Sequence, residues 1–143
     1  NTFMFFKMPL GWLSGMRVKF FDENTCLVHI RLKWLNQNPF KSMFWAAQGM
    51  AAEMTTGVLV MKAIQDSGKK VSMLVTHQDG NFTKKATGLI KFECTDGDLV
   101  ASAIKKSSET GEGQTIIMKS EGRNSEGISV ANFTFQWGIK VKN

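Results

Sequence analysis

The sequence is poor in the side chains on which much of enzyme chemistry depends. Its 143 residues include only two cysteines, Cys26 and Cys94, and two histidines, His29 and His77. The cysteines lie far apart, outside any CxxC or Cys/His cluster, so we expect small buried residues rather than a disulfide or a metal pair. A catalytic triad needs a histidine beside a nucleophile. We expect His29 to be a solvated surface residue and His77 to lie near a strand end, and both positions disfavour a triad. The sequence has no cluster of metal-ligating residues, so no metal site is predicted.

Long apolar runs and clustered charge are also missing. No run of 18 apolar residues occurs, so no membrane-spanning helix is predicted, and the N-terminal segment lacks the layout of a signal peptide. A cytoplasmic protein of one domain, residues 1–143, is therefore expected. The formal net charge of +6 comes from lysines and arginines spread along the chain. This mildly favours a phosphate-bearing partner, and without a basic stripe interleaved with aromatics we expect no nucleic-acid partner.

Residues 38 to 57 predict one helix around which the chain is organised. Asn38 is the expected N-cap and Pro39 the first helical residue. Apolar residues recur at steps of three and four and form a stripe that must be buried. The stripe comprises Phe40, Met43, Phe44, Ala47, Met50, Ala51, Met54 and Val58.

A second row on the same predicted helix is small at every position except Glu53. It runs Ser42, Ala46, Gly49, Glu53 and Gly57. Because glycine costs a helix interior about 1 kcal/mol relative to alanine, this row suggests that a ligand or another backbone approaches it. Glu53 would lie at that approach; the alternative is a solvated or salt-bridged glutamate at the helix edge.

The rest of the chain predicts mainly strands. A period of two and turn residues place strands at 17–21, 26–34, 70–78, 82–95, 114–122 and 127–141, with a turn at 79–81 and a short helix over 98–107. Residues 1–15 form an apolar segment that could seal one end of the core or dock on a second subunit. The order of elements predicts an α+β domain whose antiparallel sheet must curl around the helix.

This arrangement resembles the hot-dog fold, and several segments resemble acyl-CoA thioesterases of the phenylacetyl-CoA and 4-hydroxybenzoyl-CoA type. Asn38 and Glu53 stand at the fifteen-residue spacing of that family, and Ser72 matches a Ser or Thr on the strand after the helix. Residues 81–88 and 125–131 are similar to a strand opening and a last hairpin of the family. The resemblance covers roughly residues 17–138 and is strongest to an uncharacterised bacterial branch.

One departure lies where that family has His-Gly-Gly, because this chain has Phe44-Trp45-Ala46. The bulky Trp45 replaces a glycine whose N–H polarises the thioester carbonyl. An oxyanion hole needs an N–H rather than a particular side chain, so the backbone of Trp45 and Ala46 can still supply it. The side chain could narrow access.

The resemblance implies a thioester hydrolase in which Glu53 activates water, Asn38 and the backbone of Trp45 and Ala46 orient the thioester, and Ser72 assists. Desolvation in an apolar tunnel would raise the pKa of Glu53 towards the range of a general base. The implied substrate is an acyl-CoA or another acyl thioester, with coenzyme A as part of the substrate and no separate cofactor. The acyl chain would contact Met50 and Met54.

Two further expectations follow. Lys84 and Lys85 could hold the coenzyme A phosphates, although lysines at such positions are more often ordinary solvated charges. Hot-dog proteins usually pair so that each active site uses both subunits, which implies a homodimer or a dimer of dimers. A binding protein that holds an acyl chain or acyl-CoA without turnover, with Trp45 filling the place of the glycine, is the competing interpretation.

Overall fold

The computed structural model describes residues 1–142 and contains one sheet, four α-helices and a 3-10 helix. In chain order the elements are α1 (Thr2–Lys7), α2 (Pro9–Leu13), β1 (Arg17–Phe21), β2 (Cys26–Arg31), the 3-10 helix η1 (Trp34–Asn36), α3 (Trp45–Ser67), β3 (Val71–Phe82), β4 (Leu89–Cys94), α4 (Gly97–Thr110), β5 (Gln114–Arg123) and β6 (Ser129–Val141).

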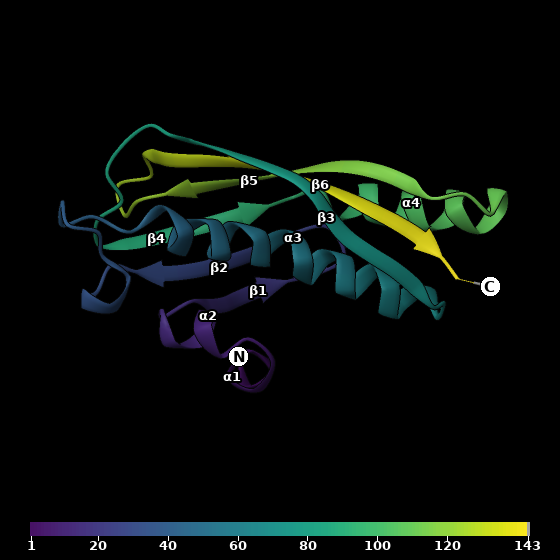
Figure 1. The fold of residues 1–143 in the computed structure, drawn as a ribbon, viewed down its shortest axis with the longest axis horizontal. Coiled ribbons are helices and arrows are strands. Elements are labelled where there is room, and N and C mark those ends of the chain that lie inside the picture. Colours follow the sequence, from purple (N-terminus) through teal and green to yellow (C-terminus); the bar gives the residue numbers. More distant parts are fainter. Residues whose placement is uncertain (143) are drawn as a thin grey trace.

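The six strands form one antiparallel sheet in the order β1-β2-β4-β5-β6-β3. The sheet curls around α3. In the view of Figure 1, α1 and α2 project below β1, and α4 lies at the right-hand end of the molecule. The predicted α+β class, with a curved antiparallel sheet wrapped around one long helix, is confirmed. Strands β1 and β3 are the two free edges, and β3 is by far the longer.

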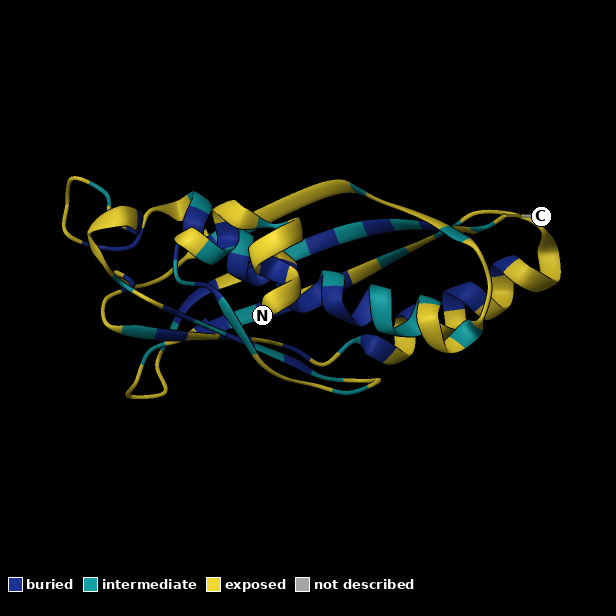
Figure 2. Ribbon diagram, turned by 90° about the horizontal axis from the view of Figure 1, so that it is seen from below, coloured by how far each residue is buried: buried dark blue, intermediate teal, exposed yellow. Residues whose placement is uncertain are grey.

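The core lies between the inner face of the sheet and α3. Burial alternates along β2, β4 and β6, and the buried residues of α3 lie between Ala47 and Val60, before its exposed C-terminal end (Figure 2). Two buried hydrogen bonds join α3 to the sheet: the Thr55 hydroxyl donates to Ser120 Oγ at 2.8 Å, and Trp137 Nε1 donates to Thr56 Oγ1 at 3.0 Å. Because unpaired buried polar groups are costly, these bonds fix how α3 is rotated against the sheet.

The central helix begins at Trp45 and not at Asn38, so the predicted N-cap is wrong. The Asn38 side chain instead accepts hydrogen bonds from the N–H groups of Phe40 and Ser42 at 2.9 and 3.2 Å, and Lys41 has φ of 62°. Local bonds of this kind compete with helix, and a left-handed residue interrupts it. Phe40 and Phe44 therefore precede the helix and are exposed, in contrast to their predicted place in the core stripe.

The predicted turn at 79–81 is also wrong, because β3 runs straight through it. Asp79, Gly80 and Asn81 pair with Thr134, Phe133 and Asn132 of β6. Glycine is needed there for space rather than for a turn, since a β-carbon on Gly80 would lie 2.8 Å from Cε1 of Phe133. The chain leaves the sheet only after Phe82, so the predicted strand 82–95 is reduced to β4.

We expect Gly80→Ala to lower the free energy of unfolding by about 1 to 3 kcal/mol, the usual cost of overpacking. The Phe133 ring would have to move against Phe82 and Phe135, whose rings lie 5.5 and 6.0 Å from it. Urea unfolding monitored by tryptophan fluorescence measures the change. Gly113→Ala is the control, because its β-carbon would meet nothing nearer than 3.8 Å; equal effects at both positions would contradict the packing argument.

Smaller corrections concern three other segments. Strand β2 ends at Arg31, so Trp34 lies on η1 and is 81% exposed rather than facing the core. Helix α4 is longer than the predicted 98–107. His29 is half-buried, not solvated: its Nε2 is enclosed without a hydrogen-bond partner, and desolvation, with Lys91 and Lys19 nearby, lowers its pKa.

The two cysteines are buried and free, as expected, but they are neighbours. Cys26 and Cys94 are paired across β2 and β4. Desolvation raises the pKa of both thiols to about 12. Because the thiolate is the reactive form, this pair is inert packing in the folded protein.

Candidate functional site

A cavity of about 560 Å³ lies at the N-terminal end of α3, between the loop before the helix and the loop after β3. It brings together four of the residues singled out in the sequence, Asn38, Trp45, Lys84 and Lys85. The other lining residues are Pro39, Phe40, Ser42, Met43, Phe44, Gln48, Phe82, Thr83 and Ala86.

Backbone hydrogen bonds hold the start of α3 in place at this cavity. The Met43 N–H donates to the Ala86 carbonyl at 2.9 Å, and the Phe44 N–H donates to the Asn36 carbonyl at 2.8 Å. Phe44 is the N-cap residue, and none of the described side chains caps the helix. The first-turn N–H groups of Trp45 and Ala46 therefore have no intrahelical acceptor, and the positive end of the helix dipole lies with them.

These two N–H groups are the oxyanion donors that the family resemblance implied. The later helix start makes them terminal donors, whereas a helix from Asn38 would have used them internally. Trp45 is 56% exposed and lines the cavity, so its side chain borders the opening. An anion or a developing oxyanion suits this position.

Asn38 organises the loop at the cavity wall rather than reaching freely into it. Its Oδ1 accepts from two backbone N–H groups, and its Nδ2 donates to Ser42 Oγ at 3.1 Å. Both polar atoms are thus engaged within residues 38–42. In this structure Asn38 positions the loop; a direct contact with a thioester stays a prediction.

Gln48 is a residue that the sequence analysis missed. It is 5% exposed and lines the cavity; its Nε2 donates to the Met43 carbonyl at 3.1 Å, while its Oε1 is buried with no partner. A buried unpaired acceptor is costly unless water or a ligand satisfies it. The signal available in the sequence was one amide within the small and apolar run of residues 45–52.

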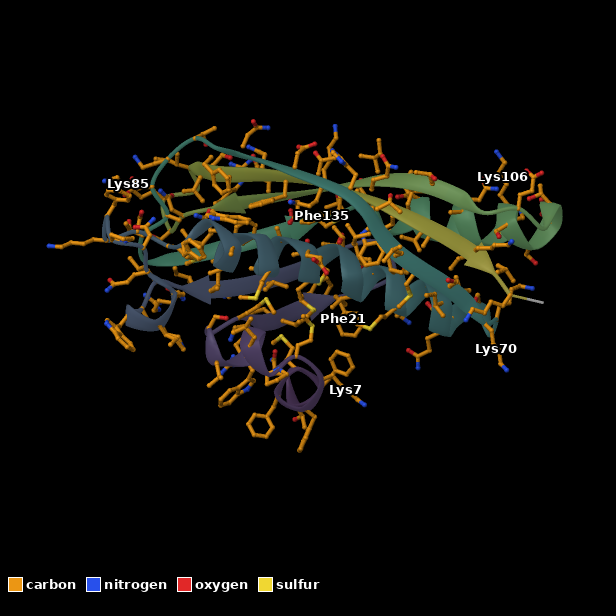
Figure 3. All side chains as sticks on the ribbon, in the orientation of Figure 1. Lys7, Phe21, Lys70, Lys85, Lys106 and Phe135 are labelled. Carbon is orange, nitrogen blue, oxygen red and sulfur yellow. The ribbon has the colours of Figure 1, made fainter. Side chains whose placement is uncertain are left out.

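Lys84 and Lys85 are exposed on the loop that follows β3, and both line the cavity. Lys85 extends from that end of the molecule in Figure 3. Neither forms an ion pair with any residue of the described chain. They are therefore available to an anionic group that enters between the two loops.

Glu53 lies apart from this cavity, two turns further along α3. Eight residues at 1.5 Å per residue separate it from Trp45, a distance of about 12 Å along the helix axis. Its neighbours in the small row face the sheet: a β-carbon on Gly49 would lie 3.7 Å from the Phe133 ring, and one on Gly57 would lie 3.9 Å from the Trp137 ring.

The Glu53 side chain is exposed, yet desolvation raises the pKa of its carboxyl group. The carboxylate of Glu53 therefore stands at the surface of α3, and the neighbouring protein atoms exclude part of its hydration. It has no salt bridge among residues 1–142, which removes the ion-paired alternative in this chain. An uncompensated, partly desolvated carboxylate is a candidate general base.

The remaining predicted site residues are not brought to the cavity. Ser72 is exposed at the start of β3 and pairs with Lys140, about ten residues or 33 Å along the strand from Phe82 at the cavity. Met54 is buried and lines a separate groove against α1 and β1. Met50 is half-buried and packs against the core.

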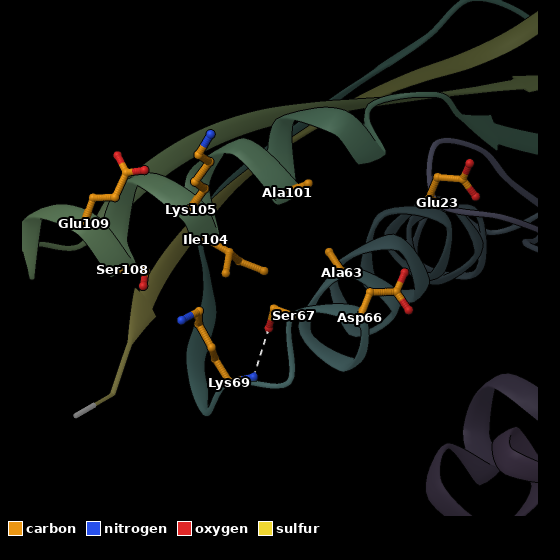
Figure 4. A pocket seen from close by; sticks show the side chains of 10 residues that line it. All are labelled: Glu23, Ala63, Asp66, Ser67, Lys69, Ala101, Ile104, Lys105, Ser108 and Glu109. Atoms are coloured by element: carbon orange, nitrogen blue, oxygen red, sulfur yellow. Dashed lines mark hydrogen bonds between the residues drawn. The ribbon is translucent and has the colours of Figure 1, made fainter.

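A second cavity, of about 470 Å³, lies between the C-terminal half of α3 and α4 (Figure 4). Its floor is apolar, with Ala63 and Ile104, and charges of both signs line its rim. The Lys69 N–H donates to Ser67 Oγ there at 3.1 Å. This is the negative end of the α3 dipole and no described polar atom is left buried and unpaired in it, so the N-terminal cavity is the stronger candidate.

Among residues 1–142 no group of three His, Cys, Asp or Glu side chains is placed to hold a metal ion. The groups at and near the site are a helix N-terminus, a buried amide, two lysines and a separate carboxylate.

Comparison with solved structures shows which proteins share this fold. A Pseudomonas aeruginosa protein of unknown function, described as a probable thioesterase, has a TM-score of 0.87 at 17% identity over 98% of this chain and 92% of that one. A Chlorobaculum tepidum protein of unknown function has a TM-score of 0.84 at 20% identity, over 99% and 91%. The Escherichia coli PaaI protein, from the phenylacetic acid degradation operon, has a TM-score of 0.67 at 13% identity, over 94% and 86%.

No curated protein matches the chain by sequence. Residues 1–139 match the family described as "Domain of unknown function (DUF4442)". The fold is the hot-dog fold, as the sequence resemblance implied. The chain belongs to the DUF4442 family.

Proposed function

We propose that the protein hydrolyses acyl-CoA or a related acyl thioester at a site shared between two subunits. The observation that carries this proposal is the start of α3, whose first N–H groups have no intrahelical acceptor and whose first residue, Trp45, lines a cavity with two lysines that form no ion pair among residues 1–142. These groups suit a thioester carbonyl that becomes an oxyanion, and the lysines suit the phosphates of coenzyme A.

The distance along α3 argues for a partner subunit. A general base must come within about 3 Å of the water it activates, directly or through one further water. Glu53 is about 12 Å from the N–H of Trp45 in the same chain. In the proposed dimer, Glu53 of one chain therefore serves the helix N-terminus of the other.

The reaction proceeds by attack of water on the thioester carbonyl carbon. The carboxylate of Glu53 takes a proton from the water as the carbon–oxygen bond forms. The N–H groups of Trp45 and Ala46 stabilise the oxyanion, and Gln48 Oε1 accepts a hydrogen bond from water or from the substrate. The carbon–sulfur bond then breaks, and the protonated Glu53 returns its proton to the leaving thiolate.

Strand β3 is the proposed dimer edge. Its twelve residues form a free edge that is exposed on both faces, with Leu74 66% and Met73 42% exposed. Long apolar edge strands pair readily with another chain. Antiparallel pairing of two β3 strands would extend both sheets into one.

We expect Leu74→Lys to convert a dimer into a monomer, because it places a positive charge on each of the two β3 strands that pair, and the two charges repel each other. Light scattering should then fall from about twice the chain mass to the chain mass, and turnover should fall with it. Ile117→Lys is the control: Ile117 is 51% exposed but lies on the interior strand β5. A monomeric, fully active wild-type protein would contradict the shared site.

The competing proposal is a protein that binds acyl-CoA without turnover, and the Trp45 side chain at the cavity favours it. A thiol-release assay across short, aromatic and long acyl-CoAs separates the two proposals. Release of coenzyme A supports the hydrolase. Saturable binding in calorimetry with no release supports the binding protein.

A further inference from the structure

An exposed apolar surface lies along the β1 side of the molecule, built from α1, α2 and η1. We call it the N-terminal face and define it by its large exposed side chains: Phe5, Phe6, Leu10, Leu13, Trp34 and Leu35. Trp34 is 81% exposed and Phe6 is 72% exposed. Around Lys7, the side chains of this region project away from the sheet (Figure 3).

The N-terminal face is a structured surface rather than a loose tail. Met4 is buried in the core and anchors α1. The rings of Phe5 and Trp12 meet edge to face at 5.0 Å, and the Arg17 guanidinium stacks over Trp12 at 4.5 Å. The Asn36 amide donates to the Ser14 carbonyl at 2.9 Å, which joins η1 to the end of α2.

Its charge is of one sign. The segments that build the face, residues 1–16 and 33–36, contain Lys7 and Lys33 and no acid, and the nearest acids along the chain are Asp22 and Glu23. Both acids lie in the turn between β1 and β2, and Glu23 lines the cavity between α3 and α4, away from η1. Lys7 and Lys33 lie on the face itself, next to Phe6 and Trp34 in the chain.

We propose that the N-terminal face docks on the surface of an anionic phospholipid bilayer. Exposed Trp, Phe and Leu beside lysines are the composition of helices that lie in the membrane interface. The apolar side chains would enter the headgroup region, and Lys7 and Lys33 would bind lipid phosphates. No described helix is long and apolar enough to cross a membrane.

A second copy of the chain fits this face less well than a bilayer does. A twofold contact through the face would bring the lysines of one copy near those of the other, with no acid on the face to pair with them. The proposed dimer uses β3, which is the opposite edge of the sheet from β1, and leaves the face free.

The face also adjoins the candidate site. Trp34 and Leu35 line a small cavity together with Asn38, and Asn38 lines the cavity at the start of α3 as well. Docking would therefore place the mouth of the site close to the bilayer surface, where long-chain acyl groups partition.

Co-sedimentation with vesicles tests the proposal. Vesicles of phosphatidylcholine with phosphatidylglycerol should bind the wild-type protein, pure phosphatidylcholine vesicles should bind it less, and 0.5 M salt should weaken binding to the anionic vesicles. Phe6→Ser with Trp34→Ser should lower the partition coefficient at least about tenfold, the factor that corresponds to 1.4 kcal/mol of lost apolar burial.

Ile117→Ser is the matched control, since Ile117 is a similarly exposed apolar residue on another surface. Circular dichroism of each variant confirms that it is folded. The proposal is overturned if the wild-type protein does not sediment with the anionic vesicles, or if the Ile117 variant loses as much binding as the double variant. It is also overturned if the double variant alters only the mass measured by light scattering, which would assign the face to a second copy of the chain.

Discussion

Glu53→Gln should lower the turnover of acyl-CoA by about 10²-fold or more while leaving the affinity for substrate nearly unchanged. The substitution keeps the size of the side chain and removes its basicity. Glu53 is the carboxylate of α3 that desolvation perturbs, and it has no salt bridge among the described residues that the change could break. Thiol release at saturating substrate measures the effect.

Glu109→Gln is the matched control, because Glu109 is an exposed glutamate on α4, outside the N-terminal cavity. It should retain full turnover. A fully active Glu53→Gln enzyme would remove Glu53 from the mechanism and would leave the binding protein as the better proposal.

The pH dependence of turnover gives an independent check. Desolvation raises the pKa of Glu53 above 4.5, and a general base acts in its ionised form. Turnover should therefore rise with pH through a value above 4.5. A profile that is flat across that region would mean that no such carboxylate takes part.

The same pKa shift predicts a small effect on stability. A carboxyl whose pKa is raised in the folded state binds its proton more tightly there than in the unfolded chain. The stability that this provides is complete below 4.5 and is lost as the pH rises through the folded pKa. Glu53→Gln should match the wild type in thermal unfolding at pH 4 and be equally or slightly more stable at pH 8.

Trp45→Pro should lower turnover by about 10²- to 10³-fold, the loss seen when one oxyanion donor is removed. Proline is well tolerated at the first residue of a helix, where it deletes the N–H, and the substitution also removes the indole. The preceding residue, Phe44, already has φ of −60° and ψ of 139°, an extended conformation that suits a following proline.

Trp45→Ala is the control for loss of the side chain, since it keeps the N–H and should remain active. If access through the cavity limits the reaction, this variant should accept bulkier acyl groups. Equal loss in the alanine and proline variants would show that the indole, and not the backbone donor, matters.

Mixing the two inactive proteins tests the shared site directly. In a heterodimer of Glu53→Gln and Trp45→Pro chains, one site receives both wild-type groups and the other receives neither. Random exchange of subunits should restore about a quarter of wild-type turnover, because half the dimers are mixed and each has one intact site. Absence of any recovery after exchange would indicate that each chain uses its own Glu53.

The fold was largely predictable because it depends on periodicity. The alternation along β2 and β6 and the apolar spacing from Ala47 to Val58 are local patterns, and burial of the sheet and helix faces against each other follows from them. Boundaries were predicted less well. Asn38 carries the signal of a helix N-cap and Gly80 that of a turn. In the structure the Asn38 side chain instead accepts hydrogen bonds within a loop, and Gly80 allows the close approach of Phe133.

The strand and helix types, the single helix that the sheet surrounds and the burial of both cysteines could be predicted from the chain, since each depends on residues close together in it. The three-dimensional structure was needed to show that α3 starts at Trp45, that the loops at 36–44 and 83–88 join to form a cavity, and that Gln48 is buried beside it. It also separated Glu53 and Ser72 from that cavity. Such distances depend on how loops close and how strands pair across the sheet, and no local pattern encodes them.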